Sequence, residues 1–208
     1  MKNNRTFIIT LIITLLPLIL VAAVYNRLPE TVVTHWGING EPDGWSPRWM
    51  LFALPVLIAG LHALCHFGSK YRDSRVNNLS PAATGLVYWI VPTVSIFGTT
   101  VTCFWALGTE LPVGMIAQLL VGTIFVVVGN YLPKCRQNTV IGIKIPWTLN
   151  DVDNWNFTHR VAGPIWMICG IAMLVAAFLN AAWVTLAVII AVVLSSFGAS
   201  LWYKIRHK

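Results

Sequence analysis

Charged residues are scarce in this sequence: they make up 10% of its 208 residues, while 57% are hydrophobic. A soluble domain usually carries roughly 25% charged residues. The deficit argues against a chain that lies mainly in water, and it leaves little polar sequence for a separate soluble domain. Together with the mean hydropathy of +0.72, it indicates that most of the chain lies in a lipid bilayer.

Long apolar runs predict six transmembrane helices, because about 20 mostly apolar residues cross a membrane as a helix. The runs 84–131 and 161–203 are each too long for one such helix. We expect the first to turn near Gly108–Pro112 and the second near Asn180. The sequence thus predicts an all-α membrane protein, a single polytopic domain over 1–208, with approximate spans 7–25, 49–67, 84–107, 111–131, 161–179 and 182–203.

The first apolar run also has features of a cleaved signal peptide. Lys2 and Arg5 precede it, and Val21-Ala22-Ala23 resembles a cleavage site. The run is longer than the roughly 7–15 apolar residues of a signal peptide. We therefore expect it to be retained as a transmembrane helix.

Basic residues are distributed unevenly between the predicted loops. Of the 14 Lys and Arg residues, only Arg27 and Arg48 lie in the first loop; the others lie at the two termini and in the second and fourth loops. Short basic loops stay in the cytoplasm, so we expect an N-in/C-in topology in a bacterial cell (inner) membrane. We attribute the net charge of +7 to contact with anionic lipid and expect no nucleic-acid partner.

The four cysteines do not predict a structural disulfide. Cys65, Cys103 and Cys169 lie within predicted spans, and Cys135 lies in a cytoplasmic loop. Disulfides are rare in that reducing compartment. None of the cysteines lies in an outer loop, where a bridge would persist.

The first loop, residues 28–48, is a candidate extracytoplasmic motif. Thr31 to Trp36 predicts an extended segment, Asn39-Gly40 and Pro42-Asp43-Gly44 predict turns, and Ser46-Pro47 is expected to cap and open the second span. The loop is either a compact cap anchored by tryptophans or a docking surface for an extracellular ligand. The ligand-facing candidates are His35, Trp36, Gly40, Pro42, Asp43, Gly44 and Trp45.

A second polar segment, residues 129–163, includes the long fourth loop on the cytoplasmic side. Gly142 and Pro146 bracket a stretch with a constrained backbone, and Asn150 or Asp151 is expected to cap a short helix running towards Arg160. An interfacial helix with snorkelling cations would also explain these residues. The candidates are Asn130, Pro133, Lys134, Arg136, Asn138, Gly142, Lys144, Pro146, Trp147, Thr148, Trp155, Thr158, His159 and Arg160.

The same segment resembles the signature of the SdpI family. Family members commonly read Gly-Ile-Arg-Thr-Pro-Trp-Thr-Leu, and here Lys144 and Ile145 replace the Arg and Thr. Lys keeps the positive charge but not the bidentate geometry. The outer loop resembles the short domain that precedes this signature. The matching residues are Leu28-Pro29, His35-Trp36, Gly40, Pro42 to Ser46, Gly129-Asn130, Leu132 to Lys134, Arg136, Asn138, Gly142 to Lys144, Pro146 to Leu149, Trp155 and Thr158 to Arg160.

The resemblance implies immunity against a secreted, membrane-active peptide toxin, without catalysis and without a cofactor. In the best-known member it also implies signalling, by sequestering a cytoplasmic transcriptional repressor at the membrane. The partners it implies are therefore the lipid bilayer, a peptide toxin and a repressor. We expect the outer loop to meet the toxin and the inner loop to carry the output.

Two other functions stay open. His62, Cys65 and His66 share one face of the second span, a spacing that can bind zinc in a membrane enzyme. No fourth ligand accompanies them, so no metal site is expected. A small-solute transporter would usually carry buried carboxylates at mid-membrane, and the predicted spans contain none.

Overall fold

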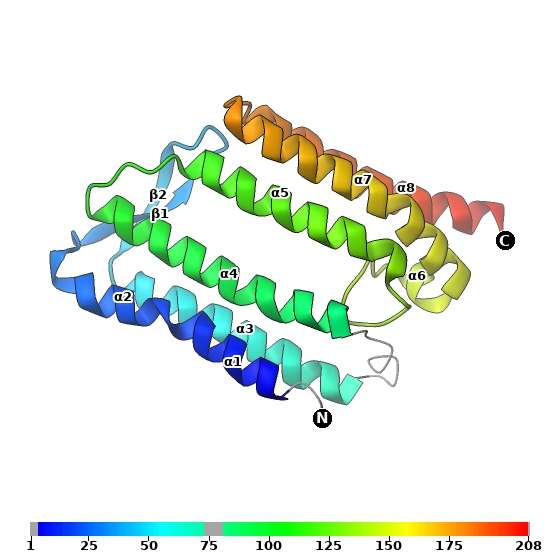
Figure 1. The fold of residues 1–208 in the computed structure, drawn as a ribbon, viewed down its shortest axis with the longest axis horizontal. Helices are drawn as coiled ribbons and strands as arrows, with labels where there is room; N and C mark the ends of the chain where they lie inside the picture. Colours follow the sequence, from blue (N-terminus) through cyan, green and yellow to red (C-terminus); the bar gives the residue numbers. More distant parts are fainter. Residues whose placement is uncertain (1–3, 73–80, 208) are drawn as a thin grey trace. The chain divides into compact units, whose positions relative to one another are not determined.

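Six helices in the described part of the chain are long and apolar enough to cross a membrane. The computed structural model describes residues 4–72 and 81–207, with side chains described except at 69–72 and 81–83 (Figure 1). Each helix overlaps one predicted span, so the expectation of six apolar helices is confirmed. The six segments are Asn4–Arg27, Met50–Gly68, Thr84–Ala106, Val113–Lys134, Val152–Phe178 and Trp183–Arg206.

The chain forms two compact units, Met1–Gly68 with Gly85–Val113 and Ser69–Thr84 with Gly114–Lys208. The first contains α1 (Asn4–Leu15), α2 (Pro17–Val24), the 3-10 turn η1 (Tyr25–Arg27), β1 (Thr31–Trp36), β2 (Pro42–Pro47), and most of α3 (Met50–Arg72) and α4 (Pro81–Ala106). The second contains α5 (Val113–Tyr131), η3 (Leu132–Lys134), α6 (Pro146–Asn150), α7 (Val152–Phe178) and α8 (Trp183–Arg206).

β1 and β2 pair as an antiparallel, two-stranded sheet, here called the outer hairpin. The register runs from Thr31 opposite Pro47 to Trp36 opposite Pro42. The extended segment predicted at Thr31 to Trp36 is confirmed. The hairpin is fixed to the first unit through a buried apolar cluster of Val21, Leu28, Val32, Leu51 and Cys103.

The second strand corrects two expectations. The protein is mostly helical, not all-α, and Ser46-Pro47 does not open the second helix: it lies in β2, and α3 begins at Met50. The strand contacts continue past it, because the Arg48 N–H donates to the Glu30 carbonyl at 2.9 Å. Pro47 is tolerated because it stands at the end of an edge strand.

Both turns predicted inside the long apolar runs are confirmed. α4 ends at Ala106 and α5 begins at Val113, with Gly108 between them at a φ of +89°. α7 and α8 run side by side (Figure 1), and Asn180 between them has a φ of 51°. Asn is one of the few residues other than glycine that tolerate this left-handed conformation.

Glycines let α5 and α7 approach closely in the second unit. A Cβ atom added at Gly122 would lie 2.9 Å from the Gly170 carbonyl oxygen, and one at Gly163 would lie 2.8 Å from the Gly129 carbonyl oxygen. Such small-residue contacts are usual between transmembrane helices. α7 and α8 share an apolar core of Cys169, Met173, Val188 and Val192.

α7 begins earlier than the predicted span at 161–179. The Asp151 carboxylate accepts hydrogen bonds from the N–H groups of Asp153 (2.9 Å) and Asn154 (3.1 Å), so a cap at Asp151 is confirmed. The helix that it caps is not short, however. It continues without a break from Val152 to Phe178, because its first polar turns are buried and hydrogen-bonded, as the next section describes.

Candidate functional site

The segment 129–163, here called the inner motif, folds around Trp155, which is fully buried. The Trp155 indole N–H donates to the Cys135 carbonyl at 2.8 Å, and its ring stacks on His159 with centroids 4.0 Å apart. A Cβ atom at Gly142 would lie 2.6 Å from both His159 Nε2 and the Trp155 ring. Gly142 also has a φ of +128°, so backbone conformation and packing both favour glycine here.

His159 uses both ring nitrogens to hold the inner motif together. Its Nδ1 lies 2.7 Å from the Trp155 carbonyl oxygen, and only a protonated nitrogen can donate to a carbonyl. Its Nε2 accepts from the Ile143 N–H at 2.9 Å, so this nitrogen carries no hydrogen. The imidazole is therefore the neutral tautomer protonated on Nδ1, and it joins α7 to the loop before α6.

Asn138 shapes the loop between η3 and α6. Its amide N–H groups donate to the carbonyls of Arg136 (2.8 Å) and Ile141 (3.0 Å), and its Oδ1 accepts from the Val140 and Ile141 N–H groups, both at 2.8 Å. Burial raises the pKa of the neighbouring Cys135 thiol to about 11, against an opposing hydrogen bond from Asn138. Cys135 is therefore a protonated, unreactive thiol at neutral pH.

Thr148 fixes the start of α6. Its hydroxyl accepts from the Ile145 N–H (3.0 Å) and lies 2.7 Å from the Ile143 carbonyl, to which it donates. Pro146 occupies the first helical turn, where its missing N–H costs nothing. The Gln137 amide donates to the Thr148 carbonyl at 2.7 Å, which joins the helix to the preceding loop.

A chain of polar side chains joins α6, α7 and α8. The Trp147 indole N–H donates to the Ser200 hydroxyl, which in turn donates to Asn154 Oδ1 at 3.2 Å. Thr158 donates to the same Oδ1 at 3.0 Å, and the Asn154 amide donates to the Ser200 carbonyl at 3.1 Å. The sequence analysis named Trp147 and Thr158 as candidates but not Asn154 or Ser200. Ser200 lies in a mainly apolar helix, far from the motif in the sequence.

The cationic residues of the inner motif lie on the surface instead. Lys134 Nζ donates to Asn130 Oδ1 at 3.2 Å, and Lys144 Nζ donates to the Val140 carbonyl at 3.1 Å. Neither lysine is buried by these contacts. The exposed candidates of the inner motif are Asn130, Pro133, Lys134, Arg136, Lys144, Pro146 and Arg160.

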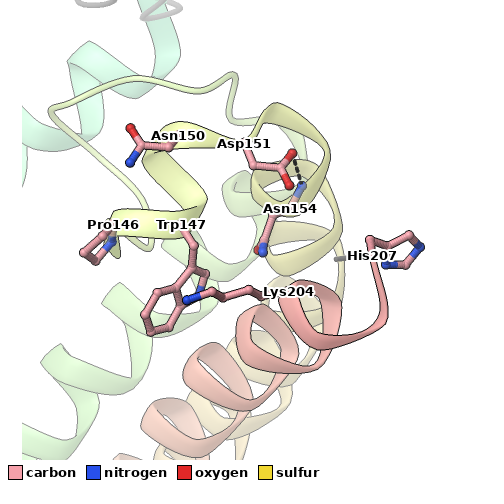
Figure 2. A pocket seen from close by; sticks show the side chains of 7 residues that line it. All are labelled: Pro146, Trp147, Asn150, Asp151, Asn154, Lys204 and His207. Carbon is pink, nitrogen blue, oxygen red and sulfur yellow. Dashed lines mark hydrogen bonds between the residues drawn. The ribbon is translucent and has the colours of Figure 1, made fainter.

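A cavity of about 360 Å³ opens beside α6 in the second unit (Figure 2). Lys204 lies across the Trp147 ring, with Nζ 4.4 Å from the ring centroid. The residues that line the cavity are Pro146, Trp147, Asn150, Asp151, Asn154, Lys204 and His207.

Three candidates of the outer hairpin, His35, Asp43 and Trp45, are exposed on its surface. His35 Nδ1 lies 2.5 Å from Asp43 Oδ1, with the two side chains 73% and 51% exposed. Trp45 is 61% exposed. Pro42 opens β2 opposite Trp36. This face therefore presents a polar pair and an aromatic ring to the surroundings of the first unit.

Trp36, Gly40 and Gly44 contribute to the packing and shape of the hairpin, unlike the exposed candidates. Trp36 packs edge-on against Trp105, with ring centroids 6.0 Å apart, and its buried indole nitrogen has no hydrogen-bond partner among the described residues. Gly40 has a φ of 82°, which the turn requires. A Cβ atom at Gly44 would lie 2.9 Å from the His35 Cβ, so the close strand pairing depends on glycine.

His62, Cys65 and His66 do not point at a common centre. His62 Nε2 lies 2.9 Å from the Thr10 hydroxyl, and His66 Nδ1 lies 2.5 Å from the Tyr88 hydroxyl. Cys65 is exposed. In the part of the chain that the structure describes, no three or more His, Cys, Asp or Glu side chains gather closely enough to hold a metal ion.

Comparison with known proteins shows which protein families the chain resembles. Residues 134–203 match the SdpI/YfhL protein family. The resemblance to the SdpI family is confirmed. The match to this family includes the inner motif from Lys134 onwards and continues through α7 into α8, so it includes Ser200. Residues 12–59 match a domain of unknown function, DUF1648, which contains the outer hairpin.

Two relatives match the chain, one of them over nearly its whole length. The immunity protein SdpI of Bacillus subtilis (strain 168) is 27% identical over 211 residues, which is 98% of this chain and 97% of that protein. An uncharacterized protein of Archaeoglobus fulgidus is 40% identical over 53 residues, 26% of this chain and 29% of that protein. No solved structure matches the chain.

Proposed function

We propose that this protein protects its cell against a secreted, membrane-active peptide toxin. The observation that carries the proposal is its likeness to the immunity protein SdpI, which takes in 98% of the chain. Six helices long and apolar enough to cross a membrane support a multi-pass membrane protein. Immunity needs a binding surface and no catalytic group, so the proposed function is not enzymatic.

In this proposal both termini face the cytoplasm and the outer hairpin faces outward. The excess of Lys and Arg at the termini and in the second and fourth loops supports this orientation. A cysteine substituted for Ile38, which is 59% exposed in the hairpin turn, should react with a membrane-impermeant maleimide on whole cells. A cysteine substituted for Arg136 should react only after lysis. The opposite pattern would contradict the orientation.

The outer hairpin is the proposed toxin-facing surface. His35, Asp43 and Trp45 are exposed there, and exposed aromatic rings are frequent contact hot spots. The hairpin holds them on paired strands, so binding would not require an unstructured loop to become ordered. The candidates that contribute the shape of the hairpin are Trp36, Gly40, Pro42 and Gly44.

The inner motif is the proposed output surface, and a cytoplasmic repressor is its proposed partner. Its buried residues hold a fixed backbone, and its exposed cations, Lys134, Arg136, Lys144 and Arg160, suit an acidic partner surface. Arg160 is the most informative of the four because it projects from α7 itself. We propose that it contacts the partner and is not required for folding.

The test is a killing assay in a sensitive host that lacks its own immunity gene. Cells expressing this protein should survive the family's peptide toxin, while cells with an empty vector should die. Membrane expression is measured by immunoblot in every strain. Death of the expressing cells at a normal membrane level would contradict the immunity proposal.

Variants of the inner motif separate protection from signalling. Trp147→Ala removes the contacts to Ser200 and Lys204, and we expect it to impair both activities. Arg160→Ala should abolish membrane recruitment of a fluorescently labelled repressor. The matched control is Arg206→Ala, which removes an exposed arginine outside the inner motif. Normal recruitment of the repressor by the Arg160 variant would show that Arg160 does not contact the repressor.

A further inference from the structure

The cavity beside α6 is lined mainly by residues of the inner motif, and its shape and charges also suit a small ligand. It lies where α6, the start of α7 and the end of α8 meet. Its volume of about 360 Å³ falls within the range of about 300–1,000 Å³ that is typical of small-molecule sites. Trp147, in its wall, is a residue type that favours the boundary between lipid and water.

The cavity contains two opposite charges that do not pair with each other. Lys204 lies over Trp147 in one wall, and Asp151 stands in another (Figure 2). Among the residues that the structure describes, no salt bridge joins Lys204 to Asp151. Asp151 uses Oδ1 to cap α7, which leaves its second oxygen available. Two separated charges of opposite sign complement a ligand that carries both signs.

An apolar stripe on α8 leads away from Lys204. Leu186, Ile190, Val193 and Phe197 are 54%, 49%, 57% and 46% exposed, and their spacing places them with Lys204 on one face of the helix. The Trp147 ring contacts Phe197 edge-on, with centroids 5.7 Å apart. The stripe is therefore continuous with the cavity wall. A small water-soluble zwitterion would gain nothing from this stripe, whereas acyl chains would.

We propose that this cavity binds the headgroup of a phospholipid that carries both a phosphate and a primary amine, such as phosphatidylethanolamine. The lipid phosphate accepts a charge-assisted hydrogen bond from Lys204. The lipid ammonium donates to the Asp151 carboxylate, and the acyl chains lie along the α8 stripe. A primary ammonium is required because a quaternary amine has no N–H group to donate to Asp151.

Lipid titration of the purified full chain, followed by native mass spectrometry, tests this site. The lipids are phosphatidylethanolamine, phosphatidylcholine with a quaternary amine, and phosphatidylglycerol without an amine. We expect phosphatidylethanolamine to bind best. Lys204→Gln and Asp151→Asn should each weaken it about tenfold, the loss expected for one charged hydrogen bond. Asn is itself a good helix cap, so Asp151→Asn removes the charge while keeping the start of α7.

The matched control is Arg206→Gln, which removes the same charge two residues along α8 and does not line the cavity. Its binding should stay within about twofold of the parent, because a surface charge outside the site contributes little. Equal weakening by Arg206→Gln and Lys204→Gln would overturn the proposal, since it would indicate general attraction to surface charge. Equal binding of phosphatidylethanolamine and phosphatidylcholine would also overturn it.

A competition arm distinguishes a lipid from a soluble ligand. Free phosphoethanolamine and inorganic phosphate are added to the protein with bound phosphatidylethanolamine. Failure of either to displace the lipid at equal concentration supports the α8 stripe as part of the site. Displacement at equal concentration would overturn the lipid assignment. Unchanged melting temperatures of the variants ensure that lost binding is not lost folding.

Discussion

The outer hairpin and the inner motif use similar residue types in opposite ways. On the hairpin, His35 and Trp45 are 73% and 61% exposed. In the inner motif, His159 is 1% exposed and Trp155 is 0% exposed, and both are hydrogen-bonded to the loop that precedes α6. A substitution in the hairpin therefore changes what the surface can bind, whereas one in the inner motif changes whether the segment keeps its shape.

The largest effect on stability is expected from Gly142→Ala, a substitution in the buried inner motif. The new methyl group would meet Trp155 and His159 and would add backbone strain, so we expect a loss of about 3 kcal/mol in the free energy of unfolding of the second unit. The measurement is thermal unfolding in detergent. The control is Gly108→Ala, which shares a positive φ but has nothing within 4 Å. Equal losses in both variants would show that packing contributes nothing.

The next largest effect is expected from Ser200→Ala. It leaves the Trp147 indole N–H without its acceptor, which should cost about 1–3 kcal/mol; Asn154 keeps its bonds to Thr158 and to the residue 200 carbonyl. Ser195→Ala is the matched control, because the one hydrogen bond of the Ser195 hydroxyl among the described residues is to the Val192 carbonyl of its own helix. Its cost should stay below about 0.5 kcal/mol. A Ser200 variant as stable as the Ser195 variant would break the proposed link between α6 and α8.

Trp45→Ala tests whether the exposed surface of the outer hairpin contributes to binding and not to stability. Its effect on stability should be within about 0.5 kcal/mol, as for other surface substitutions, while protection in the killing assay should fall about tenfold if Trp45 is a contact hot spot. Trp49→Ala removes a tryptophan of similar exposure, 56%, that lies outside the hairpin strands. Equal loss of protection by both variants would identify membrane anchors, not toxin contacts.

The smallest effect at neutral pH concerns Cys135. With its pKa raised from 9.0 to about 11, the folded thiol should have about a hundredfold less thiolate than an unfolded one at pH 8. The folded state then holds this proton more tightly, so the associated stability is complete below about pH 9 and is lost as the pH rises towards 11. The thiolate fraction of Cys135 is measured by the alkylation rates of the native and the unfolded protein across this pH range. Equal rates would contradict the burial argument.

The helices and turns were largely predictable because they depend on local properties. Hydropathy alone located the six apolar segments, and Gly108 and Asn180 marked the two turns because both adopt left-handed backbone conformations. The second strand was not predictable in this way. Pro42 to Pro47 has the composition of a turn, and it becomes a strand only because β1 supplies its hydrogen-bonding partners.

The start of α7 was hidden by the polarity of Thr158, His159 and Arg160. Each polar residue lowers the hydropathy of a segment. Thr158 and His159 are nevertheless buried in the helix, because they form hydrogen bonds to Asn154 and Trp155 one turn earlier. Gly142 and Trp155 were both among the candidates of the motif, and the structure places them in contact. Their structural role, and the contribution of Ser200 from 53 residues beyond Trp147, required the tertiary fold.

The short turn between α7 and α8 has a consequence for membrane insertion. Only residues 179–182 separate the two helices, and none of them is charged. In the proposed orientation, this turn is the part of the last helical pair that must pass through the hydrocarbon during biogenesis. No charged side chain has to make that passage, which would be costly. The two helices can therefore enter the membrane together as a preformed pair, with the basic C-terminal end remaining on the side where it was synthesised.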